Sequence, residues 1–241
     1  MNILLTGASR GLGLAIANAL LQKGHTVYAI SRSESQELAD LKNKFKDNLF
    51  FKSVDLSNPD ISRKEIFAAD FISASVKLDA FVNNAAVAYD DIATNMNLQK
   101  LENMFEINVF SPMILTKYFI RQCLLHSNRA AIVHISSVSA HTGYKGLSMY
   151  AASKGALEAF SKNIAREWGV KSIRSNIVAP GFMSTKMSQS LTDEQRSKIY
   201  ARTALKSETS AESVAETVAF LISEDSKSIT GQTICVDAGT I

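Results

Sequence analysis

Short apolar runs, rich in β-branched residues, alternate with longer helical patterns from one end of the chain to the other. This alternation is typical of βαβ units, in which right-handed crossovers place helices on both faces of one parallel sheet. We therefore predict an α/β fold with a doubly wound seven-stranded parallel sheet. The predicted strands are Ile3–Leu5, Thr26–Ile30, Leu49–Val54, Ala80–Val82, Ala131–Ser136, Ser175–Val178 and Thr233–Val236.

Helical patterns fill the connections between these strands. No Gly/Ser-rich linker, low-complexity tract or internal repeat divides the chain, so we predict one domain over residues 1–241. In such folds ligands bind beyond the carboxyl ends of the strands, where the strand order reverses. The predicted helices are Leu12–Lys23, Glu34–Lys46, Asp60–Ser75, Gln99–Leu125, Met149–Trp168 and Ala211–Ser223, with a short one near Thr192–Arg202.

Composition excludes several classes of function. The formal charge of +3 is spread along the sequence, which indicates neither a nucleic-acid groove nor a membrane-binding face and favours metabolites as partners. We expect a cytoplasmic protein, because no apolar stretch approaches the ~18 residues of a membrane span and the first is too short for a signal peptide. Cys123 and Cys235 allow at most one disulfide. No metal is expected, because metal-ligand spacing is missing from His25, His126, His134 and His141.

A glycine-rich turn directly follows the first predicted strand. It reads Thr6-Gly7-Ala8-Ser9-Arg10-Gly11-Leu12-Gly13 and opens into the first helix. Glycines let the backbone approach a pyrophosphate, and the free N–H groups and dipole of the helix N-terminus favour anions. Such a turn can also be purely structural, but its place at the start of a βαβ series favours dinucleotide binding.

The end of the second strand bears on which dinucleotide is bound. An acidic residue about 20 positions after the turn binds the ribose 2′-hydroxyl of NAD, whereas a basic one accommodates a 2′-phosphate. Here the strand ends in Ser31-Arg32, and Arg10 lies within the turn. Two guanidiniums near the adenosine ribose favour NADP(H) over NAD(H). The alternative is that both arginines are ordinary surface charges.

Tyr150 and Lys154 lie four residues apart in a predicted helix, so both side chains project from one face. A free phenol has a pKa of about 10. An ammonium ~5 Å away favours the phenolate by roughly 3 kcal/mol at an effective dielectric constant of ~20, which brings the phenol toward the range of a general acid or base. Alternatively, Lys154 simply extends into solvent. The rest of the sequence has to decide.

With the glycine turn at its start and Tyr150/Lys154 on a late helix, the chain resembles the short-chain dehydrogenase/reductase family over its whole length. The resemblance implies a Rossmann-type three-layer sandwich and an NAD(P)(H)-dependent oxidoreductase acting on CH–OH or C=O groups. Ala86 and Ala238 depart from the family pattern, which has Gly at both positions; Ala is strained there if φ is positive. Further matching stretches are Asp55-Leu56, Asn83-Asn84-Ala85-Ala86, Asn108, Ser136-Ser137, Pro180–Thr185, Gly231-Gln232-Thr233 and Val236-Asp237.

The resemblance also implies the catalytic roles. Tyr150 would donate or accept the proton, and Lys154 would lower the pKa of Tyr150 and bind the nicotinamide ribose. Ser137 would hold the substrate oxygen; it is preferred to Ser136 because it lies thirteen residues before Tyr150. Asn108 would anchor a water that connects Lys154 to solvent.

Other matched positions are implied to bind the cofactor. Asp55 and Leu56 would border the adenine, and Asn84, Ala85 and Ala86 would lie along the riboses. Around the pyrophosphate the implied residues are those of the glycine turn: Gly7, Ser9, Arg10, Gly11, Leu12 and Gly13. The segment that would close over the nicotinamide contributes Pro180, Gly181, Met183 and Thr185.

Within the family, the chain resembles bacterial 3-oxoacyl-[acyl-carrier-protein] reductases most, judged from Thr6–Gly13, Val178–Met187 and Thr230–Asp237. This implies NADPH-dependent reduction of a 3-oxoacyl thioester. We expect substrate contacts from Val138–Met149 and from a lid at residues 182–206. Their apolar side chains are Tyr144, Met149, Phe182, Met183 and Met187.

Two expectations concern macromolecular partners. A basic patch could dock an acyl carrier protein, or its residues could be ordinary solvated charges; its members would be Lys162, Arg166, Lys171 and Arg129, whereas Asn128 is uncharged. By analogy with the family, the two long helices pair subunits, so we expect a homotetramer.

Three alternative functions stay open at this point. The same chemistry could act on a sugar, a polyol or another secondary alcohol. The chain could instead be a non-catalytic NADP-binding regulator, although the complete set of Asn108, Ser137, Tyr150 and Lys154 argues against it. An extended sugar-nucleotide epimerase is disfavoured by the short chain and by the glycine spacing.

Overall fold

The computed structural model describes residues 1–184 and 192–241. Its centre is one sheet with the strand order β3-β2-β1-β4-β5-β6-β7, in which every neighbouring pair is parallel. The predicted doubly wound, seven-stranded sheet is therefore confirmed. Its strands are β1 (Asn2–Thr6), β2 (Thr26–Ser31), β3 (Leu49–Ser53), β4 (Ala80–Asn83), β5 (Ala130–Ile135), β6 (Ile173–Pro180) and β7 (Thr233–Val236).

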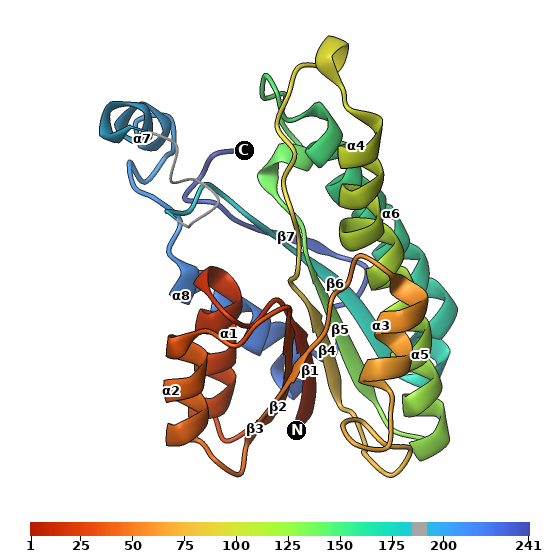
Figure 1. The fold of residues 1–241 in the computed structure, drawn as a ribbon. Coiled ribbons are helices and arrows are strands. Elements are labelled where there is room, and N and C mark those ends of the chain that lie inside the picture. The colour runs from red at the N-terminus through yellow and green to blue at the C-terminus, as the bar shows by residue number, and fades with distance from the viewer. Residues whose placement is uncertain (185–191) are drawn as a thin grey trace.

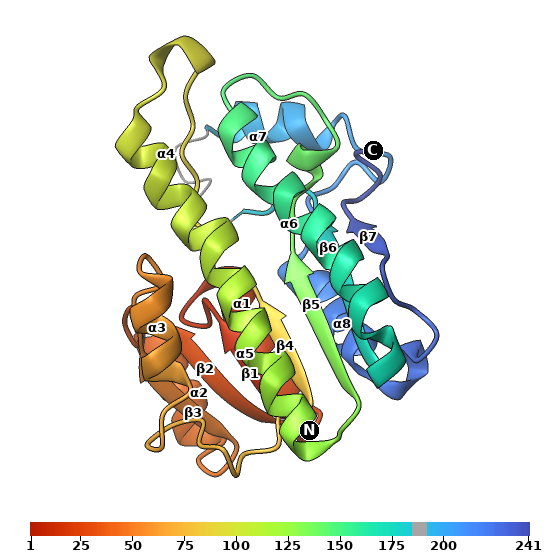
Figure 2. The same ribbon diagram turned by 90° about the vertical axis from the view of Figure 1, so that its right-hand side faces the viewer.

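Helices cover both faces of the sheet, which gives three layers (Figures 1 and 2). One layer contains α1 (Gly11–Gln22), α2 (Gln36–Lys44) and α8 (Ala211–Ile222). The opposite layer contains α3 (Pro59–Ile66), α4 (Leu98–Phe105), α5 (Ser111–His126) and α6 (Ser148–Trp168). Helix α7 (Asp193–Tyr200) stands away from the sheet (Figure 1). Single turns are η1 (Ala93–Asn95), η2 (Glu106–Phe110), η3 (Val138–Ala140), η4 (Gly169–Lys171) and η6 (Glu224–Ser226).

The central strands bury both of their faces, whereas β3 and β7 at the sheet edges are partly exposed. In β1, Ile3 and Leu5 pack into the core under α1 and α8, whereas Leu4 packs into the core on the opposite face. This two-residue period follows from the pleat, and it explains why a strand covered on both sides is apolar at every position. None of the described helices is long and apolar enough to cross a membrane. Cys123 and Cys235 are both free thiols.

The strand order reverses between β1 and β4, and this is where the candidate residues gather. Thr6 of β1 is paired with Asn83 of β4, which in turn is paired with His134 of β5. The glycine turn, Asn84 and Ser137 thus leave the same edge of the sheet from neighbouring strands. The fold places them where doubly wound sheets bind their ligands.

Helix α3 is shorter than predicted. It ends at Ile66, not at Ser75, and Phe67 leaves the helical conformation with φ −94° and ψ 53°. The apolar residues that follow have helical spacing, but Ile72 is buried in the same core as Ile66, and Phe71 packs partly against that core. A tight turn, closed by the Ile72 N–H on the Ile66 carbonyl at 3.2 Å, brings these side chains inward together.

The long helix predicted at Gln99–Leu125 is continuous but not uniform. Helices α4 and α5 are joined by the π turn η2, which contains Asn108. Pro112 has no N–H to donate to the carbonyl four residues earlier, so the regular α-helical ladder is interrupted at this point. π turns of this kind often occur at functional sites.

Candidate active site

The glycine turn after β1 is shaped for a close approach of backbone to ligand. Gly7 has a φ of 72°, and its N–H donates to the Ile30 carbonyl at 2.7 Å. A Cβ on Gly13 would lie 1.9 Å from the Gly7 carbonyl oxygen, which no side chain tolerates. The turn therefore has this path only because both positions are glycine.

Helix α1 begins without the side-chain cap found on its neighbours. Its N-cap residue Arg10 makes no capping hydrogen bond, and its first turn has no acidic residue. In contrast, Ser35 and Asn58 cap α2 and α3 with their side-chain oxygens. The N-terminal N–H groups of α1 are thus left for an external anion, and these residues fit the pyrophosphate of a dinucleotide.

Asn84 fastens this turn to the end of β4. Its amide nitrogen donates to the carbonyls of Thr6 and Gly7, both at 3.1 Å, and the Thr6 hydroxyl accepts the N–H groups of Asn84 and Ala85. Asn84 thus has a structural role that the sequence did not suggest. The φ of Ala86 is not positive, so alanine causes no backbone strain at that position. Ala238, in contrast, has a φ of 56° and lies in the left-handed region that favours glycine.

The two arginines predicted to meet a 2′-phosphate start from paired strands. Arg10 and Arg32 are both exposed, and they follow the neighbouring parallel strands β1 and β2. Nearby, Asp55 is exposed and accepts the Ser57 N–H at 2.9 Å, whereas Leu56 is buried. Their placement is compatible with the adenosine end of a dinucleotide.

Lys154 is buried beside Tyr150. Its ammonium donates to the Ile135 carbonyl at 2.8 Å and lies 5.7 Å from the centre of the Tyr150 ring. Burial lowers the pKa of Lys154 to about 8, and the negative charge of Glu158 partly opposes this shift. The two groups therefore share one face of α6, as the four-residue spacing predicted.

The pKa of Tyr150 differs from the expectation. Burial raises it to about 12, and the charge of Asp90 acts in the same direction. The predicted lowering by Lys154 is not observed. A phenol in this state keeps its proton at neutral pH and can still donate it to an alkoxide, which is a stronger base.

Two adjacent serines end β5, and their contacts distinguish them. Ser136 is buried, and its hydroxyl donates to the Glu158 carboxylate at 2.5 Å. Ser137 is partly exposed, and its oxygen accepts the Ser139 N–H at 3.2 Å, which leaves its own O–H proton for another acceptor. This arrangement favours Ser137 as the donor to a substrate oxygen.

Asn108 is buried in the π turn with its whole amide in use. Its oxygen accepts the Val87 N–H at 2.9 Å, and its nitrogen donates to the Val87 carbonyl at 2.9 Å and the Ser153 hydroxyl at 3.1 Å. The backbone carbonyl of Asn108 is the group that lacks an α-helical donor, because that donor would be Pro112. A water anchored by Asn108 would bind this carbonyl. The Ser111-Pro112 pair was the sequence signal for it.

The predicted nicotinamide segment starts at the end of β6. Pro180 is buried, and the Gly181 N–H donates to the Val236 carbonyl at 2.9 Å. A Cβ on Gly181 would lie 2.5 Å from the Thr209 hydroxyl. Phe182 packs against Tyr200 of α7, with 6.0 Å between ring centres. Within the predicted lid, Thr185 and Met187 lie outside the described residues.

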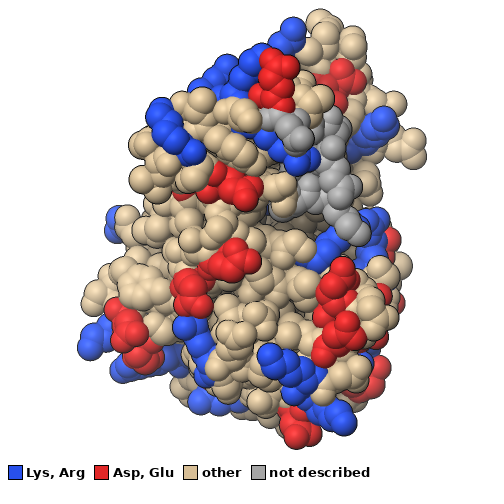
Figure 3. All heavy atoms as spheres, turned by 90° about the vertical axis from the view of Figure 1, so that its left-hand side faces the viewer, with Lys and Arg blue, Asp and Glu red and all other residues tan. Residues whose placement is uncertain are grey.

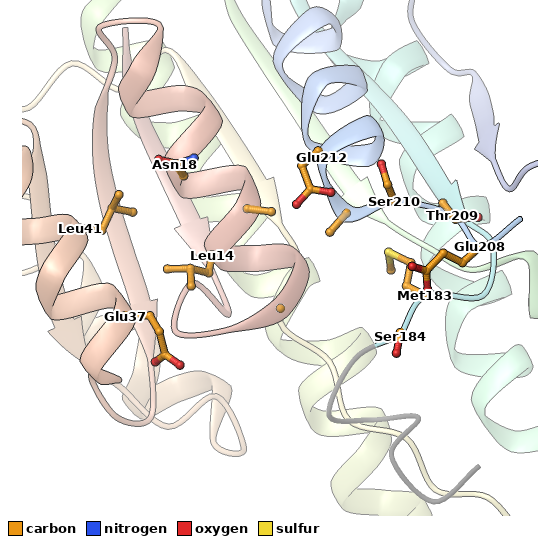
Figure 4. Close-up of a pocket in the computed structure, with 13 residues that line it drawn as sticks. Leu14, Asn18, Glu37, Leu41, Met183, Ser184, Glu208, Thr209, Ser210 and Glu212 are labelled. Atoms are coloured by element: carbon orange, nitrogen blue, oxygen red, sulfur yellow. The ribbon is translucent and has the colours of Figure 1, made fainter. Parts of the chain in front are cut away.

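A cavity of about 540 Å³ opens between α1, α2 and the start of α8 (Figure 4). Gly11, Met183 and Ser184 all line it, so the glycine turn and the predicted nicotinamide segment border one space. Glu37, Glu208 and Glu212 lie around its sides (Figure 4). This cavity could not be predicted from the sequence, because its walls come from segments about 200 positions apart.

A second cavity, of about 310 Å³, lies beside the loop that follows β4. Val87, Asp90 and Lys100 are among the residues that line it. The sequence analysis did not identify Asp90, whose negative charge contributes to the raised pKa of Tyr150. Among the described residues no group of His, Cys, Asp and Glu could hold a metal ion.

The proposed basic patch does not lie beside the active site of its own chain. Its four members are exposed, but Arg129 directly precedes β5 and Lys171 lies in the turn before β6. Ser137 lies at the opposite end of β5, about 26 Å from Arg129 at roughly 3.3 Å per residue. On the face at the left of Figure 1, cationic and anionic side chains are interspersed over the described surface (Figure 3).

Comparisons with known proteins agree with this geometry. Residues 7–240 match a family model described as enoyl-(acyl carrier protein) reductase. The chain is 35% identical to the 3-oxoacyl-[acyl-carrier-protein] reductase FabG of Rickettsia felis over 238 residues, which cover 99% of this chain and 95% of that protein.

Two solved structures share the fold over nearly the whole length. One is a short chain dehydrogenase/reductase family protein, with a TM-score of 0.88, 28% identity and coverage of 99% of this chain and 96% of the other. Another is provisionally assigned as an NAD(P)-dependent gluconate 5-dehydrogenase from Beutenbergia cavernae and contains NADP. It has a TM-score of 0.90 and 26% identity, and covers 99% of this chain and 96% of its own.

Proposed function

The chain belongs to the short-chain dehydrogenase/reductase family, and from this premise we propose that it reduces a ketone to a secondary alcohol with NADPH. As a member of that family it is an oxidoreductase that acts on CH–OH or C=O groups. The observation that carries the proposal is the grouping of Ser137, Tyr150 and Lys154 at the carboxyl end of β5, next to the uncapped glycine turn.

When bound, NADPH supplies the hydride, and the residues of the chain supply position, charge and a proton. Negative charge develops on the substrate oxygen during hydride transfer. The O–H groups of Ser137 and Tyr150 can both donate to that oxygen and stabilise the charge without rearranging. Tyr150 then gives its proton to the alkoxide.

The neighbouring groups serve this proton transfer. The Lys154 ammonium offsets the negative charge left on the Tyr150 oxygen, and it would also bind the nicotinamide ribose. A water on the backbone carbonyl of Asn108 would return a proton to Lys154 and Tyr150 from solvent. Asn84 and Asn108 hold the loop after β4 in place through the contacts described above.

NADPH is proposed over NADH because of the end of β2. Arg10 and Arg32 are exposed there, where a carboxylate would repel the 2′-phosphate. Asp55 and Leu56, Ala85 and Ala86, and the segment from Pro180 through Met183 to Thr185 are proposed to complete the cofactor site.

A 3-oxoacyl thioester is proposed as the substrate. The Rickettsia felis relative is named for that activity, and the charge of Asp90 near Tyr150 disfavours anionic substrates. The second candidate is a sugar acid or polyol, because one structural neighbour is assigned as a gluconate dehydrogenase. An aldonate carries a carboxylate that Asp90 would repel, whereas a 3-oxoacyl thioester group is uncharged.

The test compares NADPH oxidation with acetoacetyl-N-acetylcysteamine and NADP reduction with gluconate and a panel of polyols. We expect turnover of the thioester at a kcat/KM at least about tenfold above that of any polyol, consistent with the usual cost of a mismatched pocket. A chain that oxidises gluconate but leaves every 3-oxoacyl thioester untouched would have the second function.

We also propose an assembly and a location. Phe110, Leu124 and Leu125 are exposed on η2 and α5, which fits the expectation of a homotetramer paired through its long helices. Light scattering at micromolar concentration would give the mass. The two free cysteines suit a reducing cytoplasm. If an acyl carrier protein docks, the position of Arg129 and Lys171 makes another surface the better candidate.

A further inference from the structure

Glu158 is a buried carboxylate that contacts residues on either side of Ser137 in the sequence. It lies on α6, one helical turn after Lys154, and is only 6% exposed. One of its oxygens, Oε1, accepts the Ser136 hydroxyl at 2.5 Å and faces His141 Nε2 at 3.0 Å. A buried carboxylate is costly unless its partners stabilise it, so its contacts are informative.

These two contacts lie at the two ends of the turn that carries Ser137. Ser136 directly precedes Ser137 at the end of β5, and His141 directly follows the single helical turn η3. Within the turn, the Ala140 N–H donates to the Ser137 carbonyl at 3.0 Å and the His141 N–H to the Val138 carbonyl at 2.9 Å. One carboxylate therefore fastens residues 136–141 to the helix that carries Tyr150 and Lys154.

Glu158 also supplies a negative charge near Lys154. Among the described residues, the Lys154 ammonium donates to a neutral carbonyl, that of Ile135. The titratable groups around Glu158 come from four elements: Lys154 on α6, His141 after η3, Cys235 on β7, and His134 on β5, which faces Lys154. For Lys154, burial disfavours the charged form and Glu158 favours it.

We propose that Glu158 is a positioning residue, which holds the turn of Ser137 against α6 and balances the buried ammonium of Lys154. The inference rests on the proposed function, because it assigns Ser137 and Lys154 to the reaction. It adds that the carboxylate acts through both of them and touches neither substrate nor cofactor.

Two variants separate the role of Glu158 in holding residues 136–141 against α6 from the role of its negative charge. Glu158→Gln keeps an oxygen that can accept the Ser136 hydroxyl but removes the charge, whereas Glu158→Ala removes both. Glu167→Gln is the matched control, since Glu167 is an exposed residue near the end of the same helix. His141→Ala releases one end of the turn at a partly exposed position, in case neither Glu158 variant folds.

The first readout does not need turnover. Lysine labelled with ¹³C at Cε reports the titration of Lys154 by NMR, and Lys154→Arg identifies its resonance. We expect the titration midpoint to fall by about one pH unit or more in Glu158→Gln, as the loss of an adjacent opposite charge implies, and to stay in place in Glu167→Gln. An unmoved midpoint in a folded Glu158→Gln protein would overturn the charge-balancing role.

The second readout is the pH profile of ketone reduction. In Glu158→Gln the ratio of kcat/KM at pH 8 to that at pH 6 should fall by about fivefold, because a one-unit fall from a pKa of about 8 lowers the protonated fraction of Lys154 mainly at pH 8. In Glu158→Ala and His141→Ala, kcat should also fall by about 10- to 100-fold from the loosened Ser137, with NADPH affinity retained. A folded His141→Ala or Glu158→Ala protein with wild-type kcat would overturn the proposal that Glu158 holds the turn of Ser137 in place.

The two readouts keep the inference separate from the proposed function. If the wild-type protein reduces no ketone, the proposed function fails, and the NMR titration still decides the role of Glu158. If the wild-type protein is active and Glu158→Gln moves neither the midpoint nor the pH ratio, the proposed function stands and the inference fails.

Discussion

The glycine turn after β1 and the proton-transfer group at the ends of β5 and α6 lie at the same edge of the sheet but are held by different parts of the chain. The turn is fixed mainly through backbone atoms, with the Gly7 N–H on the Ile30 carbonyl and no room for a Cβ on Gly13. The proton-transfer group is fixed through side chains, in which Lys154 and Glu158 make the decisive contacts.

This difference determines how each region fails. A site built from backbone groups is damaged when atoms are added, because the ligand and the chain share the same space. A site built from side chains is damaged when atoms are removed, because the donors are themselves side-chain groups. Binding of the dinucleotide and transfer of the proton should therefore be separable by mutation.

The largest effect is expected from adding a methyl group to the turn. Gly13→Ala places a Cβ 1.9 Å from the Gly7 carbonyl, so we expect a loss of about 3 kcal/mol of stability and a fall in NADPH affinity of at least about tenfold. The control is Gly155→Ala on α6, where a Cβ meets nothing within 4 Å; it should gain up to about 1 kcal/mol. NADPH affinity is measured by fluorescence titration. A wild-type affinity in Gly13→Ala would contradict the distinction between the glycine turn and the proton-transfer group.

Removing a hydroxyl tests the other region. Ser137→Ala should lower kcat by about 10²- to 10³-fold, because it removes one donor to the developing oxyanion, while NADPH affinity stays within about twofold. Ser136→Ala removes a contact of Glu158 and should cost about tenfold at most. The two serines differ by one hydroxyl position, so equal losses in steady-state assays would contradict the assignment of Ser137.

Arg32 also tests the comparison, because it is a side chain that we assign to the cofactor site around the glycine turn. Arg32→Ala should weaken NADPH binding by about tenfold or more, as the loss of a charge-assisted hydrogen bond implies, and should leave NADH binding within about twofold. Arg166→Ala, at an exposed site on α6, is the matched control. Equal weakening of both cofactors would mean that Arg32 does not read the 2′-phosphate.

The smallest effect concerns a buried side chain that supports neither region directly. His134 lies between the rings of Phe81 and Phe160, and burial lowers its pKa to about 3. Between pH 6.5 and 3 the unfolded chain binds a proton here that the native protein does not, so stability falls as the pH falls through that window.

His134→Asn removes this contribution. The slope of unfolding free energy against pH should become shallower below pH 6.5, by up to about 1.4 kcal/mol per pH unit, in urea titrations at pH 5 and pH 7. An unchanged slope would show that His134 is protonated in the native protein.

The strands could be predicted from the sequence because each contains a short run of apolar, mostly β-branched or aromatic residues, and the central ones are buried on both faces. Tyr150 and Lys154 could be expected on one helix face because they lie four residues apart, and their proposed catalytic roles come from the resemblance to the family. Ser137 followed from its distance along the chain, and its free O–H proton supports that assignment.

What the sequence could not supply depends on contacts between distant segments. The end of α3 is set by packing of Phe71 and Ile72, whose spacing alone suits a longer helix. The raised pKa of Tyr150 depends on burial and on Asp90, sixty residues earlier, and not on the nearby Lys154. Glu158 has no motif, because its partners Ser136 and His141 are brought to it only by the fold.

The most direct test of the account is Tyr150→Phe, which removes one oxygen from the proton-transfer group and nothing from the glycine turn. NADPH affinity and the rate of 3-oxoacyl thioester reduction are measured on the same preparation. We predict an affinity within about twofold of wild type and a kcat lower by about 10²- to 10⁴-fold, the range for a lost general acid. Ketone reduction at the wild-type rate would contradict the assignment of Tyr150 as the proton donor.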